Sequence, residues 1–170
     1  MPGQTFLRRV GGLLQEIRGV QASTGAADAD KIPALDATGR LDNSMMPVGI
    51  GAETQIAPAS ENLAAGDSVN LWNDAGTMRA RKADGSSAGK PADGFVLAAV
   101  TSGQDATVYT DGINTQASGL TAGQDVYLGT TAGLVTQTAL TGAGQVHQRL
   151  GKALSATSYV FERGEPITLA

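Results

Sequence analysis

The stretch Leu63-Ala-Ala-Gly-Asp-Ser-Val-Asn-Leu-Trp-Asn-Asp-Ala-Gly76 occurs a second time, 57 residues further on, as Leu120-Thr-Ala-Gly-Gln-Asp-Val-Tyr-Leu-Gly-Thr-Thr-Ala-Gly133. Leu, Ala, Gly, Val, Leu, Ala and Gly occupy the same positions in both copies. Each copy places alternating apolar residues between two glycine-containing turns, which is typical of a β-hairpin. The same offset relates Gly94 to Gly151. We therefore predict a duplicated β-hairpin unit.

The chain from residue 61 to residue 170 has the pattern of an all-β domain. Short alternating runs are separated by turn sequences such as Asn73-Asp-Ala-Gly and Ala83-Asp-Gly-Ser. The strands expected from these runs cover residues 68–72, 78–82, 95–100, 106–109, 125–128, 134–138, 148–154, 158–161 and 167–169. The predicted fold class is mainly β, a small β-barrel or sandwich. It is built from two pseudo-repeated hairpin units, at about 61–117 and 118–170.

Residues 1–20 are predicted to form an amphipathic helix. Apolar residues follow one another at intervals of 4, 3, 4 and 3, at Phe6, Val10, Leu13, Ile17 and Val20. The pair Gly11-Gly12 weakens this helix by about 1 kcal/mol per glycine. A helix of about two heptads is only marginally stable alone in water. It must therefore pack on its own domain, on copies of itself or on another protein.

Residues 21–60 are expected to form an extended arm. Pro33 and Pro47 oppose helix formation at and before their positions. The segment is nevertheless too apolar for a solvated linker, so we expect it to lie along a surface, its own or that of a neighbour. The apolar residues that would contact this surface are Ile32, Leu35, Leu41, Met45 and Met46.

The composition of the 170-residue chain excludes several classes of function. A net charge of −4 provides no basic surface for nucleic acid. The absence of cysteine excludes disulfides and thiolate metal sites. No apolar run is long enough to span a bilayer, and the N-terminal residues lack the layout of a secretory signal. Only 4% of the residues are aromatic, so the core must be built from small side chains. Self-association would compensate for the small apolar area that such a core buries.

Known catalytic and ligand-binding motifs are missing. The single histidine, His147, has no acidic residue at helical spacing with which to bind zinc. Asp28 and Asp30 begin like a calcium loop, but Lys31-Ile-Pro interrupts the required alternation. Residues 84–90 lack the spacing of a phosphate-binding loop, and no nucleophile elbow occurs. We expect a protein that is not an enzyme and that uses no metal or cofactor.

Trp72 is the one tryptophan of the chain. It occupies the position that Gly129 holds in the second copy of the repeat. A packing or subunit-contact role is expected for it, because such residues are enriched at interfaces. A stacking platform for carbohydrate is the alternative.

Two parts of the sequence resemble proteins of tailed bacteriophages. The segment Asp30-Lys-Ile-Pro-Ala-Leu-Asp-Ala-Thr-Gly-Arg-Leu-Asp-Asn-Ser-Met-Met-Pro-Val-Gly-Ile resembles an arm that precedes a β-rich head in phage structural proteins. The Gly-x-x-Val-x-Leu…Ala-Gly pattern is followed by Arg149-Leu-Gly-Lys-Ala-Leu-Ser-Ala-Thr and Glu165-Pro-Ile-Thr-Leu. This combination is similar to small β domains of capsid decoration (cement) proteins and head-fibre proteins.

The resemblance implies a structural virion protein, made in the bacterial cytoplasm and bound to the exterior of the capsid. Such proteins often form homotrimers, bridge subunits of the major capsid protein and stabilise the head. A tail, baseplate or fibre-attachment module is the first alternative, and a carbohydrate-binding domain is the second. The residues expected to contact the capsid or sister subunits are Phe6, Val10, Leu13, Ile17, Val20, Ile32, Leu35, Leu41, Met45, Met46 and Trp72.

Overall fold

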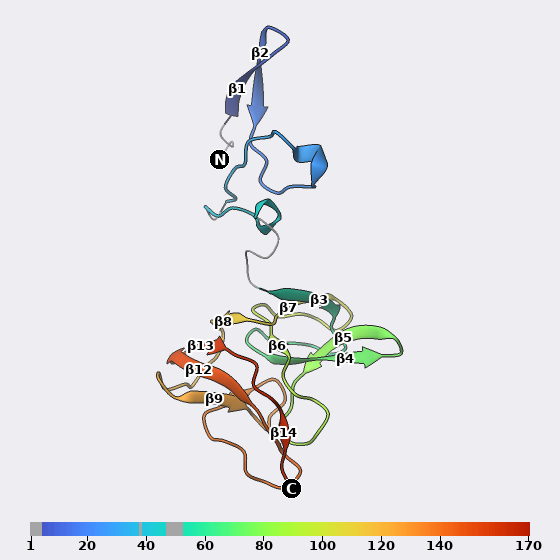
Figure 1. The fold of residues 1–170 in the computed structure, drawn as a ribbon, viewed down its shortest axis with the longest axis vertical. Helices are drawn as coiled ribbons and strands as arrows, with labels where there is room; N and C mark the ends of the chain where they lie inside the picture. The colour runs from blue at the N-terminus through green and yellow to red at the C-terminus, as the bar shows by residue number, and fades with distance from the viewer. Residues whose placement is uncertain (1–4, 38, 47–52) are drawn as a thin grey trace. The chain divides into compact units, whose positions relative to one another are not determined.

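A computed structural model describes residues 5–37, 39–46 and 53–170. The chain divides into two compact units, Met1–Gly51 and Ala52–Ala170. We call them the N-terminal unit and the β unit and describe each by itself (Figure 1).

The N-terminal unit begins with a β-hairpin. Strand β1 (Thr5–Val10) pairs antiparallel with β2 (Leu13–Arg18), with Phe6 opposite Ile17 and Val10 opposite Leu13. The loop between them is Gly11-Gly12, with φ angles of 57° and 90°. Two consecutive residues at positive φ make a type I′ turn, whose twist matches that of the flanking strands.

The helix predicted over residues 1–20 is therefore wrong. The intervals of four that join Phe6 to Val10 and Leu13 to Ile17 also fit a strand, because residues four apart lie on the same strand face. The interval of three between Val10 and Leu13 spans the turn. The two glycines, which count against a helix, are the residues that a type I′ turn favours.

The rest of the N-terminal unit folds back on the end of β2. The Val20 amide donates to the carbonyl of Ile32 at 2.9 Å, and the Ala34 amide donates to the carbonyl of Val20 at 2.8 Å. Beyond this contact the backbone turns locally, through the short 3-10 helices η1 (Ala26–Asp28) and η2 (Asn43–Met45).

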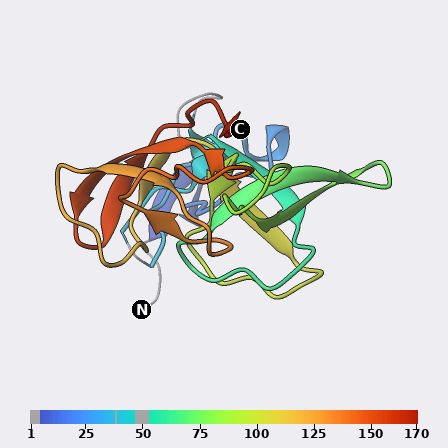
Figure 2. The same cartoon turned by 90° about the horizontal axis from the view of Figure 1, so that it is seen from below.

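The β unit contains two five-stranded antiparallel sheets among its described residues (Figures 1 and 2). The first has the strand order β3-β7-β6-β4-β5. Its strands are β3 (Thr54–Pro58), β4 (Ser68–Asp74), β5 (Thr77–Lys82), β6 (Gly94–Phe95) and β7 (Asp105–Tyr109). Residues 54–58, which the sequence analysis placed in the arm, thus pair with β7 of this sheet.

The second sheet has the order β10-β9-β12-β13-β8. Its strands are β8 (Gly112–Asn114), β9 (Asp125–Leu128), β10 (Val135–Thr136), β12 (Arg149–Ser155) and β13 (Ser158–Phe161). The remaining strands, β11 (Val146–His147) and β14 (Ile167–Thr168), pair with each other.

The two sheets share one strand order when β3, β7, β6, β4 and β5 are matched with β8, β13, β12, β9 and β10. Individual backbone contacts also recur 57 residues apart. Val69 lies opposite Gly94, as Val126 lies opposite Gly151. The Gly66 amide donates to the Val96 carbonyl, and the amide 57 residues later, at position 123, donates to the carbonyl at position 153, each at 2.8 Å.

The core of the first sheet is built from small side chains. Ala57, Ala59, Ala80 and Ala106 are fully buried beside three valines. A bridge between Ala59 and Ala80 brings the two end strands of the sheet together at one point. Alanine permits this close approach, which explains how an aromatic-poor chain fills its interior. Among the described residues neither sheet closes into a barrel, whereas the prediction of a mainly β fold is confirmed.

The second core holds the large side chains and contacts both sheets. Phe95 of β6 lies with its ring centroid 5.5 Å from that of Phe161 of β13. Beside it, the buried amide of Gln148 receives the Ala92 N–H at 2.8 Å. Its Nε2 donates to the carbonyls of Ala92 and Gly164, at 2.9 and 3.0 Å. One side chain thus joins two loops to the start of β12.

Candidate interaction surface

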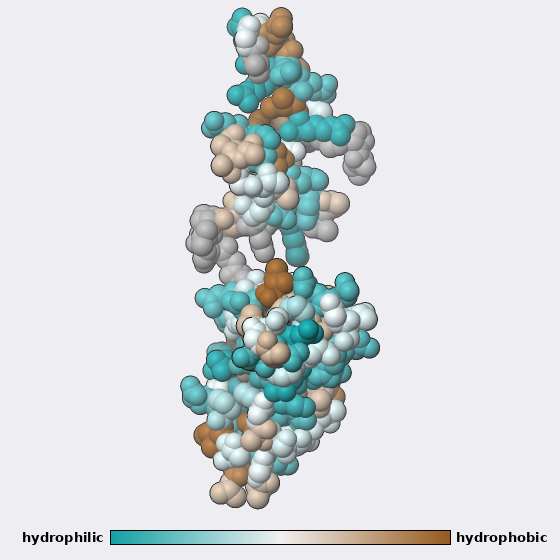
Figure 3. All heavy atoms as spheres, turned by 90° about the vertical axis from the view of Figure 1, so that its right-hand side faces the viewer, coloured by the Kyte–Doolittle hydropathy of each residue, from teal (hydrophilic) through white to brown (hydrophobic). Residues whose placement is uncertain are grey.

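The N-terminal hairpin exposes large apolar side chains. Leu7, Leu13 and Leu14 are 73%, 77% and 73% exposed. None of the hairpin residues whose burial is described is buried. Figure 3 shows hydrophobic residues at the surface of the hairpin end of the chain. An isolated two-stranded hairpin is marginally stable in water, so this element needs a covering partner.

Both faces of the hairpin carry apolar and charged side chains, because successive residues of a strand point to opposite faces. One face presents Phe6, Arg8, Leu13, Gln15 and Ile17. The other presents Thr5, Leu7, Arg9, Leu14, Glu16 and Arg18. The hairpin has three arginines against one glutamate, in a chain whose net charge is −4. The surface of the hairpin is therefore apolar with a net positive charge.

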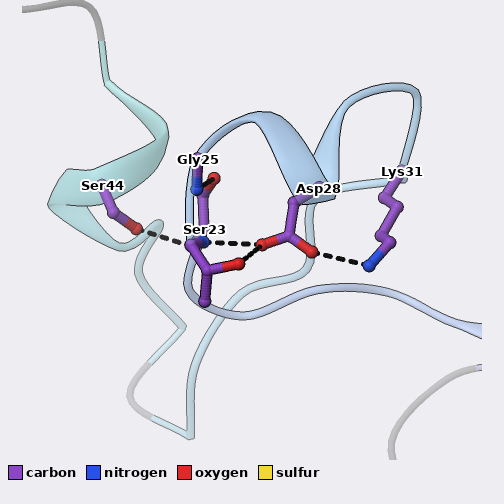
Figure 4. A network of polar contacts seen from close by, with 6 residues as sticks. Ser23, Gly25, Asp28, Lys31 and Ser44 are labelled. Atoms are coloured by element: carbon purple, nitrogen blue, oxygen red, sulfur yellow. Dashed lines mark hydrogen bonds and ion pairs between the residues drawn. The ribbon is translucent and has the colours of Figure 1, made fainter.

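A polar network holds the backbone that follows the hairpin (Figure 4). Asp28 Oδ2 accepts hydrogen bonds from the amide and the hydroxyl of Thr24, at 2.6 and 2.7 Å. Lys31 Nζ lies 2.6 Å from Asp28 Oδ1. The bonds from Lys31 and then from Thr24 hold the pKa of Asp28 far below its usual range. The carboxylate of Asp28, which begins the calcium-loop-like pattern, is thus bound by Thr24 and Lys31.

Ser44 extends this network to η2. Its Oγ accepts the Ser23 amide at 2.7 Å and donates to Asp42 Oδ1 at 2.6 Å. The sequence analysis missed this role, although Asp-x-Ser is a short pattern typical of a side chain that caps its own turn. Nowhere in the described residues do three His, Asp or Glu side chains gather closely enough to hold a metal ion.

The contact residues expected in the arm are partly exposed. Those that are more than a third exposed are Ile32, Leu35, Leu41 and Met46. Val20 and Met45 are half-buried and line a shallow hollow together with Ser23, Asp28, Lys31, Pro33 and Ser44. The side chain of Val10 lies outside the described part of the chain. The structure therefore brings Val20 and Met45 together, and it pairs Phe6 with Ile17 across the hairpin.

Trp72 belongs to the β unit and is covered by a cation. It lies on β4 opposite Arg79, and the guanidinium carbon of Arg81 is 4.7 Å from the ring centroid. Arg81 is itself held, since its Nε donates to Asn70 Oδ1 at 2.9 Å. The β4–β5 hairpin that carries these residues extends beyond the rest of its unit (Figure 2). One face of the indole is thus occupied by Arg81.

His147 packs within the β unit. It pairs with Ile167 across β11 and β14, and its ring centroid lies 5.3 Å from that of Tyr127. This half-buried position gives the histidine a packing contact.

Comparison with solved structures finds a phage protein among its matches. The chain is similar to the head fibre gp8.5 N base of bacteriophage phi29, with a TM-score of 0.46 and 15% sequence identity. The match covers 68% of this chain and 98% of the other. Neither a protein-family model nor a curated protein matches the sequence. No helix within the described ranges has the length and apolar character needed to cross a membrane.

Proposed function

We propose that the chain is a structural protein of a tailed-phage virion, in which the N-terminal unit attaches and the β unit forms the exposed body. The observation that carries this proposal is the exposure of Leu7, Leu13 and Leu14 on a hairpin that has no core of its own. Apolar side chains gathered in this way mark interaction sites. The resemblance of residues 30–50 to the arms of phage structural proteins is the reason for proposing a phage virion as the particle.

The β unit supports a role as a separate body. Both of its buried clusters consist of residues between Ala57 and Phe161, and no described residue of the N-terminal unit belongs to them. That the described hairpin residues add nothing to these cores supports a separate role for the hairpin in attachment.

Within this role we favour capsid decoration. The protein would bind the outer surface of the head, bridge major capsid subunits and stabilise the shell. Many weak contacts suffice for such a function, because linked contacts on one particle raise the overall avidity. Self-association of the chain would add to it in the same way.

We also infer that the two five-stranded sheets are copies of one ancestral unit. Support comes from the shared strand order and from backbone pairings that recur at the 57-residue offset of the sequence repeat.

Binding to particles tests the proposed function. Purified protein mixed with undecorated heads is expected to bind to saturation and to raise the temperature at which the heads open. A Leu7→Ser, Leu13→Ser, Leu14→Ser variant is expected to lose binding. Ile56→Ser is the matched control, because Ile56 is 67% exposed in the β unit. Equal binding by both variants would refute attachment through the hairpin.

Labelling of virions tests the location. Antibodies against the β unit should decorate the head in electron micrographs. Label confined to the tail or baseplate would overturn capsid decoration and leave a tail-attachment module in its place.

A further inference from the structure

One edge of β2 has no partner strand within residues 5–37, 39–46 and 53–170, where β2 pairs with β1 alone. We call it the outer edge of β2. In a hairpin with a two-residue turn, the residues flanking the turn form a hydrogen-bonded pair, and such pairs then recur at every second position. The N–H and C=O groups of Leu13, Gln15 and Ile17 therefore face β1. Those of the even-numbered residues Leu14, Glu16 and Arg18 face outward.

The same edge is already occupied just beyond β2. Val20, the next even-numbered residue, exchanges hydrogen bonds with Ile32 and Ala34 at 2.9 and 2.8 Å. This contact is an isolated parallel bridge between Val20 and Pro33. It limits the space available to an added strand to the residues before Val20.

We propose that the outer edge of β2 binds β2 of a second copy of this chain, antiparallel, with Gln15 of the two copies facing each other on a two-fold axis. In this register Leu14 exchanges backbone hydrogen bonds with Glu16 of the second copy, and Glu16 does so with Leu14 of the second copy. The two hairpins then form one four-stranded sheet.

Complementarity of the side chains selects this register. With Gln15 at the axis, Leu13 lies opposite Ile17 of the second copy. Because Ile17 already faces Phe6 across the hairpin, apolar residues form a continuous row over three strands. Cross-strand contacts of this kind are the main source of sheet stability.

The neighbouring registers are less favourable. An axis at Glu16 places the two glutamates directly opposite each other, and like charges there destabilise a sheet. An axis at Ile17 brings Leu14 of the second copy against Val20, where the edge is occupied. An axis at Leu14 leaves only three residues of each β2 paired. The axis at Gln15 pairs five.

The edge of β1 is a poorer site for a second copy. Arg8 and Arg9 stand side by side near its centre. An axis at or between them brings arginines of the two copies face to face, and charge on an edge strand protects it from pairing.

Single-cysteine variants of the full chain test the register, since the protein contains no cysteine. Facing residues at the axis form a non-hydrogen-bonded pair with Cβ atoms about 4.5–5.5 Å apart, close to the separation of a disulfide. Gln15→Cys should therefore give a covalent dimer under mild oxidation. In Glu16→Cys the two thiols lie on a diagonal, about 7–8 Å apart, and should crosslink far less. Arg8→Cys, one strand further out, should remain monomeric on a denaturing gel.

Proline variants test the edge by light scattering. Glu16→Pro removes an outward N–H and should convert the dimer to monomer. Leu7→Pro removes an outward N–H from β1 and should leave the dimer intact. A monomeric wild-type chain would refute the proposal. So would equal crosslinking of Gln15→Cys and Glu16→Cys, or a dimer that survives Glu16→Pro.

The β2 pairing uses the same hairpin as the proposed attachment to heads, but the two can be refuted separately. If the chain binds heads yet gives no Gln15→Cys dimer, the β2 pairing is wrong and attachment stands. If the dimer forms and heads are not bound, attachment is wrong and the pairing stands. A two-fold pair also differs from the trimer that the phage resemblance implies.

Discussion

At the scale of single residues, Gln148 is a fully buried polar side chain that makes three hydrogen bonds to the backbone. It satisfies both the N–H and the C=O of Ala92 and also the carbonyl of Gly164. Replacing it by leucine keeps the volume but leaves these backbone groups without partners. We expect Gln148→Leu to lower the free energy of unfolding by roughly 2–3 kcal/mol in a urea titration. Gln124→Leu is the control, because that side chain is exposed, and a similar loss there would contradict this account.

Tyr159 makes the free energy of unfolding of the β unit decrease at alkaline pH. Its burial raises the pKa of the phenol, against the opposing effect of the hydrogen bond that Asn114 Nδ2 donates to the phenol oxygen. The unfolded chain releases this proton near pH 10, while the folded chain holds it to a higher pH. The contribution is therefore complete below about pH 10 and is lost as the pH rises further. Tyr159→Phe should flatten this decline in urea titrations between pH 9 and 11, and an unchanged slope would contradict the assignment.

At the scale of elements, two glycines in equivalent strands keep neighbouring backbone close. A Cβ atom at Gly94 would meet the carbonyl oxygen of Tyr109, and one at Gly151 would meet that of Val160. Gly94→Ala and Gly151→Ala should each lower stability by about 1–3 kcal/mol in thermal unfolding. Gly119→Ala serves as control, because nothing lies within 4 Å of its Cβ position and only its φ of 71° opposes a side chain. A larger loss in the control would refute the packing explanation.

Local patterns predicted most of these elements. All nine strands expected between residues 68 and 169 overlap observed strands, because alternation and turn residues act over a few neighbours. Three strands of the β unit were missed, namely β3, β8 and β11. Their partner strands lie far away in sequence, and a pattern of a few neighbouring residues does not show which strands pair. The hairpin was mistaken for a helix because its intervals suit both, and Gly11-Gly12 was the signal that could have decided.

The candidate site was less predictable than the strands. The apolar character of Leu13 and Ile17 was visible in the sequence, and a helix and a hairpin both place them on one face. That Arg8 and Gln15 share this face, and that β2 has a free edge among the described residues, follows only from the register of the hairpin. The network around Asp28 likewise needs the fold, because Ser23 and Ser44 are 21 residues apart.

At the scale of the whole molecule, the β unit should unfold independently of the hairpin. Deleting residues 1–20 removes no buried residue of either cluster. We expect the calorimetric transition of the β unit to keep its midpoint, while self-association and binding to heads are lost. A lower midpoint would mean that the hairpin packs against the β unit and does not serve a partner.

Trp72 gives this molecule a spectroscopic label of its own. It is the sole tryptophan, and it lies on β4 under the guanidinium of Arg81. Indole emission therefore originates from a single hairpin of the β unit, and Arg81→Ala should change its intensity by uncovering the ring. Titrating heads while recording this emission would distinguish binding through the surface around Trp72 from binding through the N-terminal hairpin. A signal that stays constant through saturation means that the indole's surroundings are undisturbed when the particle is bound.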